Sequence, residues 1–262
     1  MSTLSHVEPH AALPEIRRIG LPDLRTALEA GIADFREMPS HAVFLCLFYP
    51  VAGLLIGGFL LRYNVAPLLF PLVAGFALVG PFAAVGLYEL SRRRELGIDT
   101  FWEHAFDVLR SPAKWSILAL GVLLFAIFIA WLLIAEWLYR QTLGPLAPPD
   151  AVAFFRDLFT TAAGWKMIVF GNLIGFVFAV VAMSLSVVSF PLLLDRHVSA
   201  AVAMLTSVRA VMENPGAMTL WGMIVAAGLA AGSVLFLLGL AVVMPVLGHA
   251  TWHLYRRVVA PG

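Results

Sequence analysis

Residues 217–259 form a long hydrophobic block, and no charged residue occurs between Glu213 and Arg256. A helix rises about 1.5 Å per residue, so this block is much longer than one crossing of a hydrocarbon core about 30 Å thick requires. The block must therefore fold back on itself or project beyond the membrane. We expect a short helix that ends near residue 231 and a second helix over residues 233–255, with Pro245 inside it.

The composition also indicates an integral membrane protein. Hydrophobic residues make up 61% and charged residues 13% of the 262 residues, and the charged fraction of an ordinary soluble domain is about twice as high. The net charge is only +1, so nucleic acid is not expected as a partner. The one cysteine, Cys46, excludes an internal disulfide framework. Residues 1–20 lack the long apolar segment of a secretory signal, and we expect them to form a flexible cytoplasmic tail.

A pattern of an amphipathic helix, a proline and a hydrophobic helix occurs three times along the chain. The prolines are Pro39, Pro112 and Pro215, and the amphipathic helices before them cover about residues 21–38, 100–111 and 200–213. Ser199 is expected to cap the third. The hydrophobic segments cover about residues 43–62, 67–90, 115–139, 167–194, 218–231 and 233–255.

We therefore predict an all-α, polytopic membrane protein of six transmembrane helices. The helices would form three hairpins, each preceded by an amphipathic surface helix. Residues 21–262 would be a single membrane domain with repeat-like units over about 21–92, 93–196 and 197–257.

The distribution of positive charge predicts the orientation. If the six crossings start inside the cell, only Arg62, Arg140, Arg156 and Lys166 of the 17 Lys and Arg residues lie outside. This asymmetry satisfies the positive-inside rule, so we predict a multi-pass protein of the bacterial inner (plasma) membrane with both termini in the cytoplasm. Trp115, Trp221 and Trp252 would then lie at the inner interface of the membrane, and Trp137 and Trp165 at the outer one.

The end of the last helix contains the candidate site residues. His249 and His253 are four residues apart, so they share one helix face, as two ligands of a metal or haem would. His41, His104 and His197 are expected on the same side of the membrane. Two histidines before an arginine pair are also typical of an ordinary helix end at the lipid head groups, where cations meet the helix dipole. We prefer that interpretation, and we predict no catalytic residues and no cofactor.

Charged residues within the expected crossings lie near the helix ends. Glu89 can reach Arg92 or Arg93, and Glu136 can reach Arg140. A charge deep in a bilayer usually marks an ion or substrate path. The positions of these two glutamates therefore favour simple ion pairs over a proton-coupled or ion-coupled transporter.

Three segments of the chain resemble a known bacterial family. They are IRRIGLPDLRTALEAGIADFREMPSHAVFLCLFYP, LVGPFAAVGLYELSRRRELG and VMPVLGHATWHLYRR. These segments are similar to the uncharacterised integral-membrane family known as domain of unknown function 2189, with a resemblance that would extend over nearly the whole chain from Pro14. The resemblance implies a polytopic inner-membrane protein with no established activity.

The favoured function is a non-enzymatic accessory or scaffolding subunit that packs against other integral membrane proteins in the lipid bilayer. Apolar surface and small-residue faces such as Gly171 with Gly175 are abundant, whereas polar chemistry within the membrane is scarce. One alternative is a small-solute or lipid transporter built on the three repeats. The other is a metal-binding or haem-binding membrane enzyme that uses His249 and His253.

Overall fold

The computed structural model describes residues 13–38, 84–144, 150–196, 198–234 and 239–262, with scattered positions between 51 and 82. Most of the expected first crossing, about half of the second, His41, Cys46 and His197 lie outside the described residues. The described elements are helices, and no strand occurs among them. They are α1 (Leu21–Glu37), α4 (Val85–Glu95), the 3-10 helix η2 (Trp102–Arg110), α5 (Lys114–Thr142), α6 (Ala151–Thr160), α7 (Ala162–Ser186), α8 (Ser189–Asp195), α9 (Ala200–Glu213), α10 (Pro215–Val234) and α11 (Leu240–Val258).

Three segments of the described chain are long and apolar enough to cross a membrane. They are α5, the stretch Ala162–Asp195 that contains α7 and α8, and α10. They correspond to the third, fourth and fifth crossings expected from the sequence. The all-helical membrane fold is therefore confirmed, whereas the count of six crossings and their arrangement as three hairpins stay predictions.

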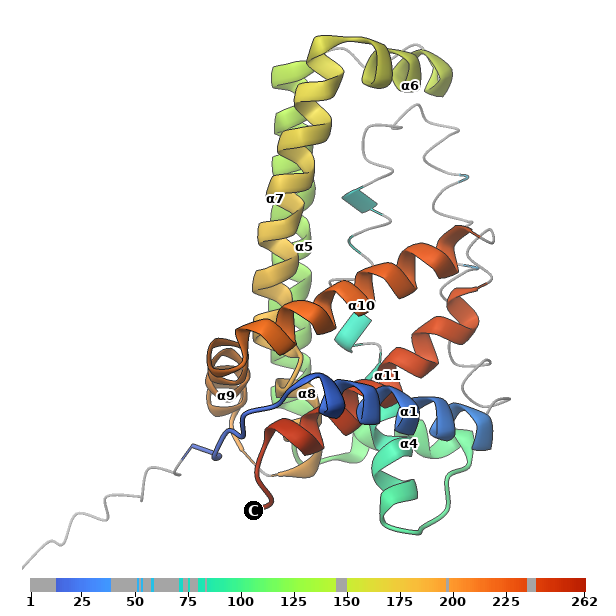
Figure 1. Cartoon of the computed structure of the whole chain (residues 1–262), viewed down its shortest axis with the longest axis vertical. Helices are drawn as coiled ribbons and strands as arrows, with labels where there is room; N and C mark the ends of the chain where they lie inside the picture. Colours follow the sequence, from blue (N-terminus) through green and yellow to red (C-terminus); the bar gives the residue numbers. More distant parts are fainter. Residues whose placement is uncertain are drawn as a thin grey trace, which may run out of the picture.

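Helices α5 and α7 pack side by side along their length, and α6 lies across one end of the pair (Figure 1). Gly175 permits close packing, because a Cβ atom there would lie 3.1 Å from the Trp131 ring. Trp131 stacks on Phe178, with 6.3 Å between the ring centroids. At the α6 end, the ring of Phe154 packs 6.2 Å from that of Tyr139. The small residues of α7 are thus used in packing within the chain.

The last hydrophobic block contains two helices, as expected. The first extends to Val234 rather than ending near residue 231, and the second is Leu240–Val258 rather than residues 233–255. Helices α10 and α11 contact each other, and Gly228 of α10 lies beside Val243 and Leu247 of α11. Both run obliquely to the α5–α7 pair (Figure 1). The C-terminal end of α11 lies at the same end of the molecule as α1 and α4.

The surface helices bury several small residues and expose some of their large apolar ones. In α9, Ala203 and Ala210 are buried, while Met212 is 73% exposed. In α1, Gly31 is buried and Ile32 is exposed. A helix at a membrane surface turns its large apolar side chains toward lipid, so the exposed stripes are those expected of interfacial helices. The Ser199 cap is confirmed, since its hydroxyl accepts from the Val202 amide at 3.3 Å.

The two terminal segments lie against each other at this end. Arg17 donates its backbone N–H to the Val258 carbonyl at 2.7 Å, and Ala260 donates to Glu15 at 3.0 Å. The side chain of Asn214 accepts from the Ile19 amide at 2.8 Å and donates to the Arg17 carbonyl at 3.1 Å. Residues 15–19, within the segment expected to form the tail, are therefore attached to the end of α9 and to the segment after α11.

Candidate functional site between α1, α4 and α11

Two close contacts between helices bring the polar residues of α1, α4 and α11 together. A Cβ atom on Gly31 of α1 would lie 2.6 Å from the Cβ of Ala250 in α11. A Cβ atom on Gly248 of α11 would lie 2.7 Å from the Leu87 side chain of α4. Each glycine lets two backbones approach more closely than a larger residue would allow. Short polar side chains next to these contacts can then reach one another.

Asp34 is the centre of the site. Its side chain is 2% exposed, and its Oδ2 accepts from Ser91 Oγ at 2.6 Å and lies 2.9 Å from His253 Nε2. Its Oδ1 accepts from the Arg94 guanidinium. Burial raises the pKa of the carboxyl, but the hydrogen bonds from His253, Ser91 and Arg94 outweigh burial and hold the pKa below its ordinary value. Asp34 is therefore a buried carboxylate that holds three helices together.

The two candidate histidines meet at this carboxylate and not at a shared open position. His249 is completely buried, and its Nδ1 lies 2.7 Å from Ser91 Oγ and 3.9 Å from Asp34 Oδ2. Because the single hydroxyl proton of Ser91 is donated to Asp34, His249 donates from Nδ1. Its Nε2 makes no hydrogen bond among the described residues. His253 is partly exposed and donates to Asp34.

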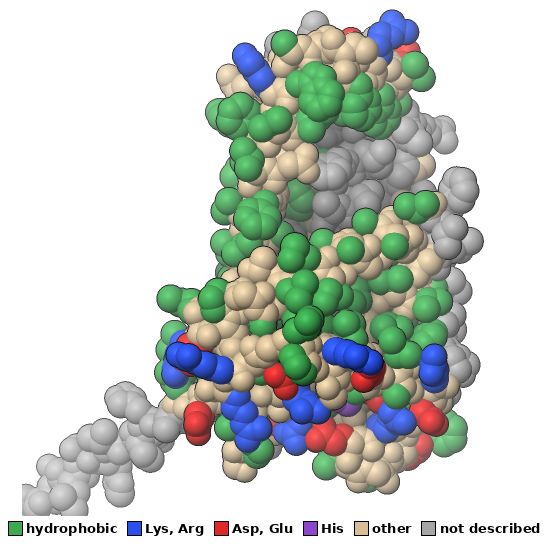
Figure 2. All heavy atoms as spheres, viewed as in Figure 1, with side chains coloured by type: hydrophobic (Ala, Val, Ile, Leu, Met, Phe, Trp, Pro, Cys, Tyr) green, Lys and Arg blue, Asp and Glu red, His purple; other side chains and the backbone are tan. Residues whose placement is uncertain are grey.

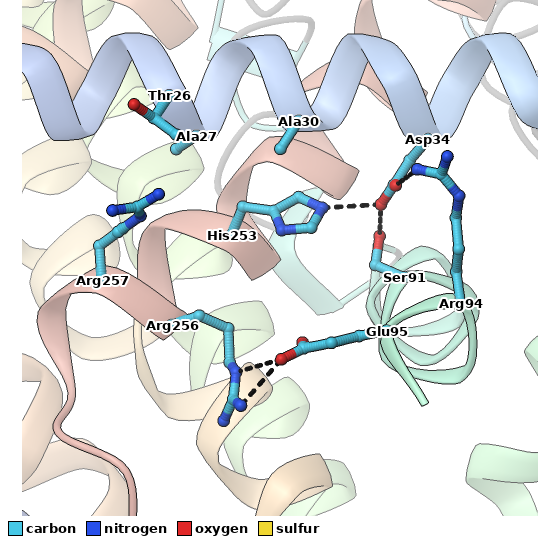
Figure 3. A pocket seen from close by; sticks show the side chains of 10 residues that line it. All are labelled: Thr26, Ala27, Ala30, Asp34, Ser91, Arg94, Glu95, His253, Arg256 and Arg257. Atoms are coloured by element: carbon cyan, nitrogen blue, oxygen red, sulfur yellow. Dashed lines mark hydrogen bonds and ion pairs between the residues drawn. The ribbon is translucent and has the colours of Figure 1, made fainter. Parts of the chain in front are cut away.

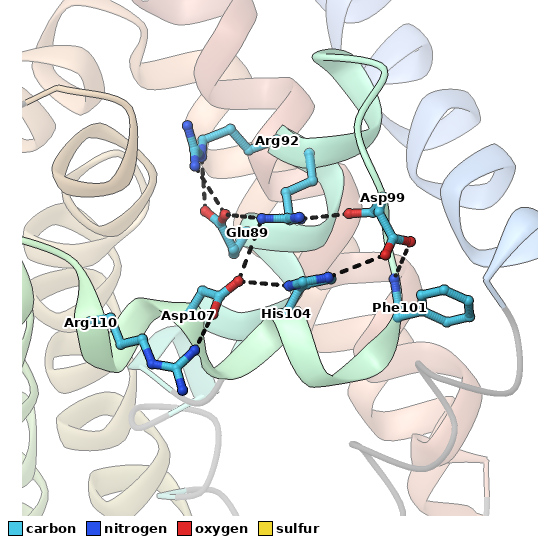
Figure 4. Close-up of polar contacts among 8 residues, drawn as sticks. Glu89, Arg92, Asp99, Phe101, His104, Asp107 and Arg110 are labelled. Atoms are coloured by element: carbon cyan, nitrogen blue, oxygen red, sulfur yellow. Dashed lines mark hydrogen bonds and ion pairs between the residues drawn. The ribbon is translucent and has the colours of Figure 1, made fainter.

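The described residues contain no group of three His, Cys, Asp or Glu side chains suited to a metal ion. The metal or haem hypothesis at His249 and His253 stays a prediction. His104 contacts other partners: its Nδ1 lies 2.8 Å from Asp107 and its Nε2 3.3 Å from Asp99 (Figure 4). The hydrogen bond with Asp107 raises the pKa of His104, although burial opposes the shift. This second network joins η2 to the end of α4.

The arrangement at Ser91 differs from that of a hydrolytic serine. In a catalytic triad the imidazole lies between the serine and the carboxylate, one on each nitrogen. Here Ser91 and Asp34 both face the Nδ1 atom of His249, and Ser91 is 1% exposed. The Ser91 hydroxyl is already bonded to Asp34 and to His249. The geometry therefore favours a structural or binding role over nucleophilic catalysis.

A second set of hydrogen bonds, separate from those of Asp34, reaches α8. Glu95 accepts from Trp252 Nε1 at 3.0 Å and from Arg256 Nε at 3.0 Å. Arg256 also contacts Asp195 at 3.4 Å, and Tyr255 donates its hydroxyl to the same carboxylate. These contacts attach the C-terminal end of α11 to both α4 and α8.

Beside the carboxylates is a cavity of about 520 Å³ (Figure 3). Its ionisable lining residues are Asp34, Arg94, Glu95, His253, Arg256 and Arg257, and α1 contributes the small side chains of Thr26, Ala27 and Ala30. The cavity lies in a band of charged side chains at one end of the molecule (Figure 2). It is large enough for a small ligand.

The sequence identified His253 and His249 but missed their partners. The sequence pattern gives Asp34 no role, whereas the structure buries it. One signal was present: Ala27 and Gly31 continue to Asp34 at helical spacing and form a face of small residues. A carboxylate that continues such a face will be carried into a close helix contact. The expected local pairs are confirmed, with Glu89 at 2.8 Å from Arg92 and Glu136 at 2.8 Å from Arg140.

Comparison with known proteins gives one match. No curated protein and no solved structure matches the chain. The match to a family model takes in the segment around Ser91 and Glu95 and ends at Asp195, so it includes α4, η2 and α5 to α8. The opening and closing segments that supported the resemblance lie outside it. Residues 69–195 match the model of the family described as "Predicted integral membrane protein (DUF2189)", which confirms the family expected from the sequence.

Proposed function

We propose that the protein is a non-enzymatic accessory or scaffolding subunit of the bacterial inner membrane. The observation that supports this function best is the outer surface of the α5–α7 pair. On α7, large apolar side chains at helical spacing are exposed, among them Val169, Leu173 and Phe176, the last of which is 66% exposed. Such a stripe can accept a transmembrane helix of another integral membrane protein.

The small-residue face of α7 supports the same assignment. Gly171 and Gly175 face Leu138 and Trp131 of α5, so the hairpin is closed by contacts within the chain. The outer stripe is then a separate surface with no packing role in the described part of the molecule. A partner helix would bury it without disturbing the hairpin.

The polar side chains of α7 favour an accessory role over a transporter. Asn172 is exposed and donates to the Ile168 carbonyl of its own helix at 2.7 Å, and Ser186 donates to Ala182 at 2.6 Å. A solute path needs polar groups directed into a common cavity. Side chains that bond to their own helix do not supply them. For the alternative of a metal-binding or haem-binding enzyme, the contacts of His249 and His253 with Ser91 and Asp34 favour a structural use of both rings.

The proposed topology has six crossings in three hairpins, with both termini in the cytoplasm. Pairing of Arg17 with Val258 supports an even number of crossings, because it holds the two terminal segments on one side. Arg256 and Arg257 lie at that end of α11, and the positive-inside rule makes it the cytoplasmic side.

A photocrosslinking experiment tests the accessory role. Benzoylphenylalanine would replace Phe176 on the outer face or Phe178, which stacks on Trp131 within the hairpin. Irradiation of intact cells should give a discrete adduct with one integral membrane protein from position 176 and only an internal crosslink from position 178. Native mass spectrometry of the gently extracted protein should then contain the same partner. A bare monomer, together with no protein adduct from positions 169, 173 and 176, would contradict the proposal.

A further inference from the structure

The cavity between α1, α4 and α11 has more positive than negative groups. Three arginines, Arg94, Arg256 and Arg257, face two carboxylates, Asp34 and Glu95. Both carboxylates are already bonded: Asp34 contacts Ser91, His253 and Arg94, and Glu95 contacts Trp252 and Arg256. Arg94 and Arg256 are thus bonded to these carboxylates, and Arg257 is the lining arginine that pairs with neither of them.

Arg257 is the cation with the weakest partner in the cavity. It makes no hydrogen bond among the described residues, and its ion pair with Asp23 spans 3.9 Å. Its side chain is 49% exposed and lies on the side of the cavity opposite Asp34 (Figure 3). Arg94, by contrast, bonds to Asp34, and its Nη2 atom lies 3.7 Å from the exposed carboxylate of Glu37. Arg257 can thus donate toward a ligand in the cavity.

The cavity also lies at the level where lipid head groups are expected. It lies at the end of the molecule that carries the charged band of Figure 2, and it is lined by α1, whose Ile32 side chain is exposed. Interfacial helices and clustered arginines both lie at the boundary between acyl chains and head groups.

We propose that this cavity binds a phosphate group, either that of an anionic phospholipid head group or free phosphate. The planar guanidinium of Arg257 would donate to two phosphate oxygens. The small side chains of Ala27 and Ala30 leave the room that the phosphate and its glycerol occupy. This assignment does not depend on the proposed accessory role.

Titration of the delipidated, detergent-solubilised full chain tests the assignment. Native mass spectrometry would follow binding of dioctanoyl phosphatidic acid, with dioctanoylglycerol as the lipid that lacks phosphate, and calorimetry would follow inorganic phosphate. Phosphatidic acid should bind and dioctanoylglycerol should not. Arg257→Gln should weaken phosphate-dependent binding at least tenfold, since it removes charged hydrogen bonds worth ~1.5–3 kcal/mol.

Two further variants separate binding from stability. Arg209→Gln is the matched control, because Arg209 is also partly exposed but pairs with Glu213 on α9, outside the cavity. It should bind as the unaltered protein does. Ala30→Leu fills the cavity while keeping every charge, and it should weaken binding as Arg257→Gln does. Melting temperatures would establish that the variants are folded.

The outcomes also identify the source of the phosphate. Binding of phosphatidic acid that inorganic phosphate does not displace supports a lipid head group. Binding of inorganic phosphate alone supports a soluble ligand. Equal binding of phosphatidic acid and dioctanoylglycerol, binding unchanged by both Arg257→Gln and Ala30→Leu, or no binding of either phosphate probe would overturn the assignment.

Discussion

The backbone of Gly31 lies against Ala250 so closely that a Cβ atom at position 31 would be 2.6 Å from the Ala250 Cβ and 2.6 Å from its backbone nitrogen. This contact between α1 and α11 sets the distance over which Asp34 reaches His253. The buried polar site therefore depends on a residue that carries no functional group itself.

Gly31→Ala should lower the free energy of unfolding by about 1–3 kcal/mol, because the added methyl overpacks a backbone contact that has no flexible neighbour to yield. Thermal unfolding of the detergent-solubilised protein measures the effect. Gly216→Ala is the control, since a Cβ atom at position 216 has no neighbour within 4 Å. That variant should melt at the same temperature as the unaltered protein or slightly higher, and equal losses in both variants would refute the packing argument.

Asp34→Asn should destabilise the protein by about 3–5 kcal/mol, as expected when one partner of a buried ion pair is removed. The amide cannot accept all the bonds that Ser91, His253 and Arg94 donate, so buried donors lose their partner. Chemical or thermal unfolding gives the measurement. Glu29→Gln on the same helix removes only an exposed pair with Arg25 and should leave the melting temperature almost unchanged. A similar small effect in Asp34→Asn would mean that the carboxylate is not needed for the helix junction.

His104 should remain protonated at a pH where an ordinary histidine, with a pKa of about 6.5, is largely neutral. Its pKa is raised in the folded protein, so the stabilisation it provides is fully present below the unfolded value and is lost as the pH rises through the folded value. A carbon-detected NMR titration of labelled histidines measures this directly. Asp107→Asn should lower the pKa of His104 more than Asp99→Asn does, because the Asp107 contact is 2.8 Å and the Asp99 contact is 3.3 Å. The reverse order would be evidence against this geometry.

Asn214→Ala should release the segment that precedes α1. The change removes the acceptor of the Ile19 amide and the donor to the Arg17 carbonyl, while the bond from Arg17 to Val258 remains. Hydrogen–deuterium exchange at the Ile19 amide should accelerate about tenfold, equivalent to one hydrogen bond of ~1–1.5 kcal/mol. Asn172→Ala is the control, because Asn172 bonds only to its own helix, and exchange at Ile19 should be unaffected by it.

The long apolar helices could be predicted from the sequence because their evidence is local. Mean hydropathy and length identify α5, α7 and α10, and Ser199 marks the start of α9. Glu89 with Arg92 and Glu136 with Arg140 are pairs within one turn of a helix, so their spacing alone was sufficient. The tryptophans expected at the inner interface differ in exposure. Trp115 is exposed, as expected of an interfacial residue, but Trp221 and Trp252 are buried within the chain, each 1% exposed.

The direction in which each apolar face points was beyond sequence reasoning. Lipid tails are as apolar as a leucine side chain, so hydrophobic periodicity does not distinguish a face toward lipid from a face toward another helix. In α1 and α9 the large residues Ile32 and Met212 lie outside and the small residues lie inside. Leu24 of α1 is buried as well, but the closest contact of that helix is made at Gly31, which a search for hydrophobic stripes ranks low.

The sequence by itself determined that the chain is an all-helical membrane protein, where its longest helices lie, and that His249 and His253 share a face. Only the tertiary structure decided what those histidines contact. Asp34 is 219 residues from His253 and 57 from Ser91 along the chain. Helical periodicity relates residues within a turn or two, whereas these bonds exist because Gly31 and Gly248 allow three helices to approach closely enough for short polar side chains to meet.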